Sequence, residues 1–279
     1  MTYENHRIQA FTLIELLIAL ALLGTILAAV VYVNIGTVRA SASLQARNEL
    51  LADTQVAQNY MVSKLKQASY IFPVGANVQM TAAGGTSTKP TGGTNWVVGT
   101  DPIIAFIMPP TTVTPGGCTP ATATTVANPC YAFYAYYAMK RSAYVAASSG
   151  TDDPGDDGLN DPTSWVLIEY RGYYSNIASY GGNSYSTAAI DIPTGNRGRL
   201  LLDYVQAVSI APLPFVVANA PSLAISQAPG ITNVTLNLAV QRNVAGQIIQ
   251  LPGINTNTPA GRYIQTVYPR NVGQPQLNN

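Results

Sequence analysis

The sequence predicts an α+β protein in which one long amino-terminal helix precedes an antiparallel β-sheet head. Three observations support this fold class. Residues 16–38 contain no acidic or basic side chain, and residues 39–69 are mostly good helix formers without proline or glycine. Beyond residue 75, paired glycines and prolines separate short runs rich in aromatic and β-branched residues, which is typical of turns and strands. A helix followed by such strands is an α+β arrangement.

The first part of the helix is apolar enough to cross a membrane. About 20 apolar residues span the hydrocarbon core of a bilayer as a helix, and residues 16–38 meet that length. The alternative is a secretory signal peptide cleaved near residues 40–42, Ala-Ser-Ala. A signal peptide has an apolar core of roughly 7–15 residues, whereas this core is longer and Glu15 stands where it would begin. We therefore expect residues 11–38 to form a transmembrane helix.

Glu15 is a charged side chain at the edge of this apolar segment. A carboxylate within a membrane costs about 2.5–3.5 kcal/mol on insertion scales, so it needs a partner. A cut between Ala10 and Phe11 would create one, because the new α-amine of Phe11 is cationic and lies four residues from Glu15 on the same helical face. That amine could also meet the glutamate of a neighbouring copy. The second arrangement would join subunits and set their axial offset.

Residues 10–20, Ala-Phe-Thr-Leu-Ile-Glu-Leu-Leu-Ile-Ala-Leu, resemble the processing and methylation signature of type IV prepilins and pseudopilins. The resemblance implies that prepilin peptidase removes residues 1–10 and that the chain assembles through its apolar helix, which would then lie in a filament core. The family usually has glycine at the position of Ala10. The roles that the resemblance assigns are processing for Ala10 and Phe11, N-methylation for Phe11, and assembly for Phe11, Glu15, Leu16 and Leu20, with Glu15 as the fifth-residue glutamate.

The resemblance also implies partners and a location. The partners are other major and minor pilins, prepilin peptidase and the inner-membrane assembly machinery. The protein would be held in the bacterial inner membrane by a single pass, with its head outside the cytoplasm, and would then enter a surface filament. The long head and residues 266–271, Thr-Val-Tyr-Pro-Arg-Asn, look most like PilW-type minor pilins and J-type pseudopilins. The expected function is that of a minor pilin whose head serves tip, initiation or surface contacts.

The second part of the helix, residues 39–72, is expected to be amphipathic and to pack on the head, residues 73–279. Pro73 favours an end to the helix, and Gly24 and Gly36 are weak points at which a bend or local unwinding is a hypothesis. The apolar residues at helical spacing are Leu44, Leu51, Ala57, Met61, Leu65 and Ala68. Strands are expected at residues 103–108, 131–139, 165–170, 234–240 and 264–268.

The composition argues against several other classes of protein. Only 10% of the 279 residues are charged and the formal net charge is +1, whereas binding nucleic acid by bulk electrostatics needs a strongly basic face. The single histidine, His6, lies in the leader, so the mature chain lacks the usual general base. We therefore expect no enzymatic activity. An exported hydrolase would have to use scattered carboxylates that no motif joins: Glu169, Asp191 and Asp203.

The alternative to a filament subunit is a membrane-tethered extracytoplasmic binding module, such as an adhesin or a DNA-capture subunit of a competence apparatus. The 17 tyrosines of the chain leave this open, because a tyrosine ring can stack on a ligand or bind a surface. Cross-strand packing explains most of them equally well.

Cys118 and Cys130 are the only cysteines of the chain. Export would place the head in an oxidising compartment, where such a pair commonly forms a disulfide. Closing a loop of this size stabilises the folded state by about 3 kcal/mol in the chain-entropy model. A redox or metal-binding pair is the alternative, but the spacing is not that of a CxxC motif.

A cluster of carboxylates occupies residues 151–161. With its turn-forming glycine and proline residues, this segment could bind a calcium ion through Asp153, Asp157 and Asp161. The match to a calcium loop is poor, because Gly155 and Ser164 stand where ligands are expected. A solvated hairpin tip is the alternative explanation. Calcium is the one cofactor that the sequence suggests.

Overall fold

The computed structural model describes residues 12–68, 70–80, 85–108, 131–174, 198–206, 213–219, 231–253 and 262–269. Ala10, Phe11, Cys118 and Cys130 lie outside these ranges. The expected cleavage, methylation and disulfide therefore stay predictions. The chain divides into two units, Met1–Gln45 and Ala46–Asn279.

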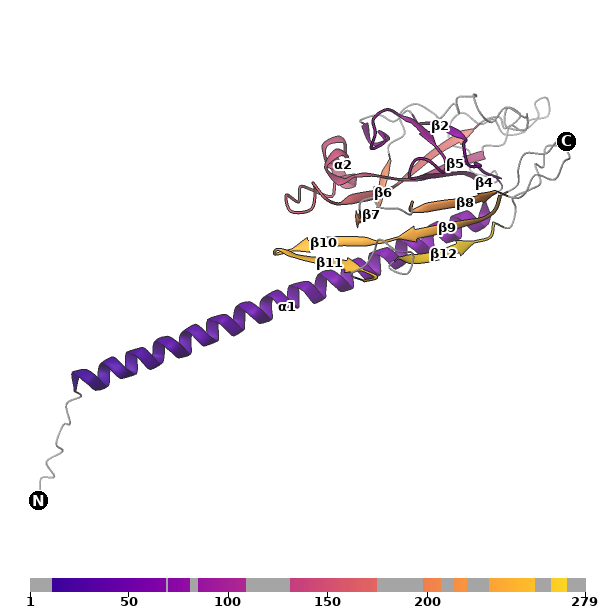
Figure 1. The fold of residues 1–279 in the computed structure, drawn as a ribbon. Coiled ribbons are helices and arrows are strands. Elements are labelled where there is room, and N and C mark those ends of the chain that lie inside the picture. Colours follow the sequence, from indigo (N-terminus) through magenta and orange to yellow (C-terminus); the bar gives the residue numbers. More distant parts are fainter. Residues whose placement is uncertain are drawn as a thin grey trace, which may run out of the picture. The chain divides into compact units, whose positions relative to one another are not determined.

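Helix α1, Leu13–Gln67, belongs to both units and forms their only shared element among the described residues (Figure 1). It is α-helical through Gly24 and Gly36, so the local unwinding considered for these glycines is absent. A single amino-terminal helix followed by strands confirms the predicted α+β class.

The carboxyl end of α1 lies close to the end expected near residue 69. Helix α1 stops at Gln67, inside the expected segment 39–72, because the chain then enters a sheet. Strand β1, Tyr70–Ile71, pairs with β4, Ile103–Met108, and the Phe72 N–H donates a hydrogen bond to the Ala105 carbonyl at 2.9 Å. Sheet pairing thus takes the backbone groups that a longer helix would have used.

The buried stripe of α1 in the second unit follows the predicted helical period with one exception, Leu51, which is only partly buried at the edge of the core. Leu44, which was also expected on the stripe, belongs to the first unit and is 61% exposed. The buried residues of that stripe are Ala46, Leu50, Thr54, Ala57, Met61, Val62 and Leu65, and Ala68 is buried directly after the helix.

Among the described residues, the strands form three antiparallel sheets (Figure 1). The largest has the strand order β1-β4-β5-β6-β7-β10-β11, the second β12-β9-β8, and the smallest β2-β3. Two short helices, α2 (Arg141–Ala147) and η2 (Gly150–Asp152), follow β5. The remaining strands are β2 (Asn77–Gln79), β3 (Asn95–Val97), β5 (Tyr131–Lys140), β6 (Trp165–Tyr174), β7 (Arg199–Val205), β8 (Phe215–Asn219), β9 (Ile231–Leu238), β10 (Val240–Val244), β11 (Gln247–Leu251) and β12 (Tyr263–Val267).

One predicted strand proves to be two. The alternating segment 234–240 was expected to be continuous, but it is divided at Ala239 between β9 in the three-stranded sheet and β10 in the seven-stranded sheet. The Ala239 carbonyl accepts a hydrogen bond from the Gln206 N–H at 2.8 Å, next to the end of β7. The side-chain alternation runs on across the change of sheet, so it gave no sign of the break.

The core of the second unit lies where β4, β5 and β6 meet the buried stripe of α1. Every residue of β4 is buried, and Tyr136, Tyr137 and Tyr170 are fully enclosed. The Phe106 ring stacks on the Tyr134 ring at a centroid distance of 5.5 Å. These tyrosines are used for cross-strand packing, which is the second of the two explanations that the sequence allowed.

Candidate functional site

The amino-terminal end of α1 is closed by a reciprocal hydrogen-bonded cap between Thr12 and Glu15. The Thr12 N–H and the Thr12 hydroxyl both donate to Glu15 Oε2, each at 2.9 Å. In return, the Glu15 N–H donates to the Thr12 carbonyl at 3.1 Å and approaches Thr12 Oγ1 at 3.4 Å. This is a capping box, which satisfies backbone donors that the first turn of a helix would otherwise leave free.

The capping box engages only one oxygen of the Glu15 carboxylate. Both hydrogen bonds end on Oε2, and no described residue donates to Oε1. The Oε1 atom is therefore open to a further donor. Sequence reasoning identified Glu15 but missed its bond to Thr12, although the signal was present as a threonine three residues ahead of a glutamate at the start of an apolar run.

The apolar side chains that follow Glu15 face outward on all sides of the helix. Every residue from 12 to 41 is exposed within its own unit, including the predicted assembly residues Leu16 at 58% and Leu20 at 59%. By length and composition α1 contains a segment that can cross a membrane. A helix that is apolar all round needs lipid or protein around it.

The two threonine side chains within this apolar segment bond to their own helix. The Thr25 hydroxyl donates to the Leu22 carbonyl and the Thr37 hydroxyl donates to the Asn34 carbonyl, each at 2.8 Å. Hydroxyl groups bonded in this way are already satisfied in an environment without water. The segment is thus suited to lipid or to a packed bundle of helices.

Residues 5–31 match the family model of the prokaryotic N-terminal methylation motif. The chain carries the type IV pilin and pseudopilin signal. The matched segment includes the capping box, Leu16, Leu20 and the predicted cleavage point after Ala10, and it ends before the second unit begins. Comparison with curated proteins gave no match, and comparison with solved structures gave none either. The family resemblance is therefore confirmed at the motif, which implies processing by prepilin peptidase and assembly with other pilins.

Part of the acidic segment of the head belongs to a polar network around Arg141. Arg141, which is 1% exposed, donates through Nε to Asp203 Oδ1 at 2.9 Å and through Nη2 to Asp203 Oδ2 at 3.1 Å. Its Nη1 atom pairs with the Asp161 carboxylate. Burial alone would lower the pKa of Arg141, but its hydrogen bonds with Asp203 and Asp161 outweigh that effect and raise the pKa. The guanidinium group therefore stays charged between two carboxylates.

Asp157 extends this network toward β7. The Tyr204 hydroxyl donates to Asp157 Oδ2 at 3.0 Å, and Asn160 Nδ2 donates to the same oxygen at 2.8 Å. Burial would raise the pKa of Asp157, but these two bonds and a bond from the Leu159 N–H outweigh it and lower the pKa. The carboxylate thus holds in place both Tyr204 and the loop of residues 153–164, which joins η2 to β6.

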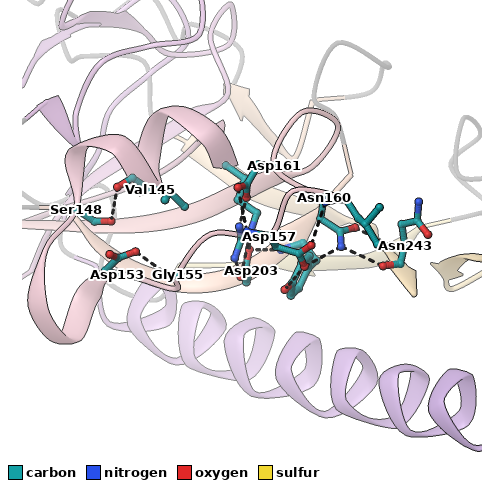
Figure 2. Close-up of polar contacts among 12 residues, drawn as sticks. Val145, Ser148, Asp153, Gly155, Asp157, Asn160, Asp161, Asp203 and Asn243 are labelled. Carbon is teal, nitrogen blue, oxygen red and sulfur yellow. Dashed lines mark hydrogen bonds and ion pairs between the residues drawn. The ribbon is translucent and has the colours of Figure 1, made fainter. Parts of the chain in front are cut away.

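Asn160 links the same loop to β10. Its Oδ1 atom accepts from the Asn243 N–H at 2.6 Å, and its Nδ2 atom donates to the Asn243 carbonyl at 3.1 Å (Figure 2). The side-chain amide thereby bonds to the β10 backbone three residues after Val240, the residue at which β10 pairs with Val205 of β7. The buried Asn160 was missed by sequence reasoning, because its partner lies far along the chain and no local pattern signals such a contact.

The three residues proposed for calcium do not form one group. Asp153 accepts from the Gly155 N–H at 2.9 Å, whereas Asp157 and Asp161 belong to the network around Arg141 (Figure 2). Within the described ranges, no set of three or more His, Cys, Asp or Glu side chains is placed to hold a metal ion. Calcium binding would require Asp157 and Asp161 to leave these contacts, and it stays a prediction.

The carboxylates weighed for a hydrolase are also used in ion pairs. Glu169 is buried and accepts from Arg171 Nε at 2.6 Å, and Asp203 pairs with Arg141. Asp191 lies outside the described residues. That the protein has no enzymatic activity stays a prediction.

Proposed function

We propose that this protein is a minor pilin or pseudopilin that assembles through α1 into a type IV pilus or a related filament. The observation that carries the proposal is the Glu15 carboxylate, which stands at the start of an exposed apolar helix within the methylation motif and keeps Oε1 without a donor among the described residues. A buried carboxylate in an apolar filament core requires a cation. The methylated amine of Phe11, from the same chain or from a neighbouring one, supplies it.

The capping box makes the two roles of Glu15 compatible. The Oε2 atom closes the helix with Thr12, which leaves Oε1 to accept from the amine. The capping box fixes the Glu15 carboxylate on its own helix. The amine of a neighbouring subunit can therefore meet that carboxylate at only one position along the filament axis. The apolar surface around Leu16 and Leu20 then provides the packing area, and the pair sets the register.

In this proposal the protein is held in the bacterial inner membrane until it enters the filament, and its head is presented on the outside for tip, initiation or surface contacts. The membrane-tethered adhesin or DNA-capture module is the competing function. It has the same helix but needs neither cleavage nor methylation.

Mass spectrometry of the protein purified from its native membranes separates the two functions. A mature chain that begins with N-methyl-Phe11 is expected for the filament subunit. A chain that still contains residues 1–10, in cells whose other pilins are processed, would reject the filament function and support the tether. Sheared surface filaments from the same cells should contain the mature form.

A further inference from the structure

The capping box places the first helical residue two positions after the predicted cleavage point. Thr12 is the cap and Leu13 is the first residue of α1, whereas the bond to be cut joins Ala10 to Phe11. A cap residue has a backbone conformation outside the helix, so the helix stops there. The box therefore acts as a stop signal directly beside the site of processing.

The leader contains no other stop close to this bond. Threonine, serine, aspartate and asparagine are the residues that cap helices well, and the nearest such residue before Thr12 is Asn5. Residues 6–11 contain neither glycine nor proline. Without Thr12, nothing in this segment prevents α1 from extending toward the amino terminus through the bond to be cut.

A helix that included this bond would hinder its hydrolysis. Peptide groups inside a helix have their N–H and C=O groups bonded along the chain and are surrounded by side chains from adjacent turns. A peptidase must unwind them before its own groups can reach the carbonyl. In the hydrolysis itself the amide bond breaks, water supplies the hydroxyl of the new Ala10 carboxyl group, and Phe11 leaves as a free amine.

We propose that Thr12 is a positioning residue for leader removal, because its capping box with Glu15 ends the helix before the Ala10–Phe11 bond. This inference rests on the proposed function, since it assumes that the bond is cut. It assigns to Thr12 a task in processing that is separate from the task of Glu15 in assembly.

Four variants of the full-length chain test the proposal in bacterial membranes that contain prepilin peptidase. Thr12→Ser keeps the hydroxyl and should be cut at the rate of the wild type. Thr12→Ala removes the cap and should be cut about fivefold more slowly, as expected from the usual contribution of a capping residue. The initial rate of leader loss is measured by mass spectrometry.

Proline at the first helical position provides a stop that needs no hydroxyl group. Proline is accepted there, and it disfavours a helical conformation in the residue before it. Leu13→Pro alone should therefore be cut like the wild type, and Thr12→Ala combined with Leu13→Pro should regain the rate that Thr12→Ala loses. Rescue by this route distinguishes a helix stop from a direct contact between the hydroxyl and the peptidase.

The outcomes separate this inference from the function on which it rests. Equal rates for wild type and Thr12→Ala would overturn the role of Thr12 while leaving the filament function intact. The role of Thr12 would also be overturned if the leader of the double variant were removed as slowly as that of Thr12→Ala, or if the leader of Thr12→Ser were removed more slowly than that of the wild type. A wild-type chain that the peptidase does not cut would instead contradict the proposed function itself.

Discussion

The first turns of α1 and the second unit use apolar side chains in opposite ways. In the segment from Leu13 to Ile35 they point outward, and Leu20 is 59% exposed. In the second unit the equivalent side chains point inward, and Met61, Phe106 and Val234 are fully enclosed. The same hydrophobic effect explains both patterns, because the surroundings differ: the second unit buries its own apolar surface from water, whereas the first segment needs lipid or other helices.

The two regions also differ in the partners of their charged side chains. Between residues 12 and 38 the only charged side chain is Glu15, and one of its oxygens has no donor among the described residues. In the second unit the guanidinium group of Arg141 is enclosed and bonded to two carboxylates. A carboxylate with an acceptor atom left open by the described residues points to a role in binding a further donor, whereas a charge bonded to partners within the head points to a role in stability. The variants below separate these roles.

Glu15→Ala should give the largest effect, and it should act on assembly without changing the stability of the head. Removing the carboxylate leaves the amine of Phe11 without its counter-ion in an apolar environment, so the amount of protein in sheared filaments should fall by at least about tenfold. The head should unfold at the same denaturant concentration as in the wild type, because Glu15 belongs to the other unit.

Glu15→Gln is the matched control for this prediction. Glutamine can still form the capping box, but it carries no charge. If the glutamine variant assembles as well as the wild type, the amine–carboxylate pair is not what sets the register. Immunoblots of sheared filaments and of membranes from the same cells measure both variants.

Arg141→Met should have the next largest effect, and it should act on stability. The substitution leaves the partly buried carboxylates of Asp161 and Asp203 without their cation, and breaking such a pair costs about 3–5 kcal/mol of unfolding free energy. Denaturation of the full chain in detergent measures this loss. The leader should still be removed, because the network lies in the second unit.

Arg242→Met removes a more exposed pair and serves as the control. Arg242 approaches Glu49 at 3.3 Å, and the two side chains are 30% and 49% exposed. Exposed pairs contribute about 1 kcal/mol or less. Equal losses for Arg141→Met and Arg242→Met would contradict the view that enclosure makes the Arg141 network important.

The sequence was sufficient for features that depend on local pattern. The apolar run predicted the first part of α1, and β4 occupies the predicted residues 103–108. Features that depend on distant partners were not predictable in this way. Arg141 lies 20 residues from Asp161 and 62 from Asp203, so no local spacing indicates their contact. The division at Ala239 was missed for the same reason, because the alternating pattern does not show which sheet the backbone joins, and around the division Asn237 and Ala239 are buried as well.

The smallest effect should come from the pH dependence of the head. The hydrogen bonds of Asp157 lower its pKa in the folded state, so the charged form stabilises the fold. That contribution is complete above the ordinary aspartate pKa of about 4, and it is lost as the pH falls through the lower pKa of the folded state. Asparagine has no charge and so lacks this contribution at every pH. The Tm of Asp157→Asn should therefore lie a few degrees below that of the wild type at pH 6, and the difference should be smaller at pH 3.

Asp156→Asn is the control for this measurement, because Asp156 is exposed and accepts no hydrogen bond from the described residues. Its Tm should follow the wild type at every pH. If Asp157→Asn also runs parallel to the wild type between pH 6 and pH 3, its bonds to Tyr204 and Asn160 do not favour the charged form. The acidic loop would then contribute no more than a solvated turn, and the contrast between an internally paired head and an externally paired helix would rest on Arg141 alone.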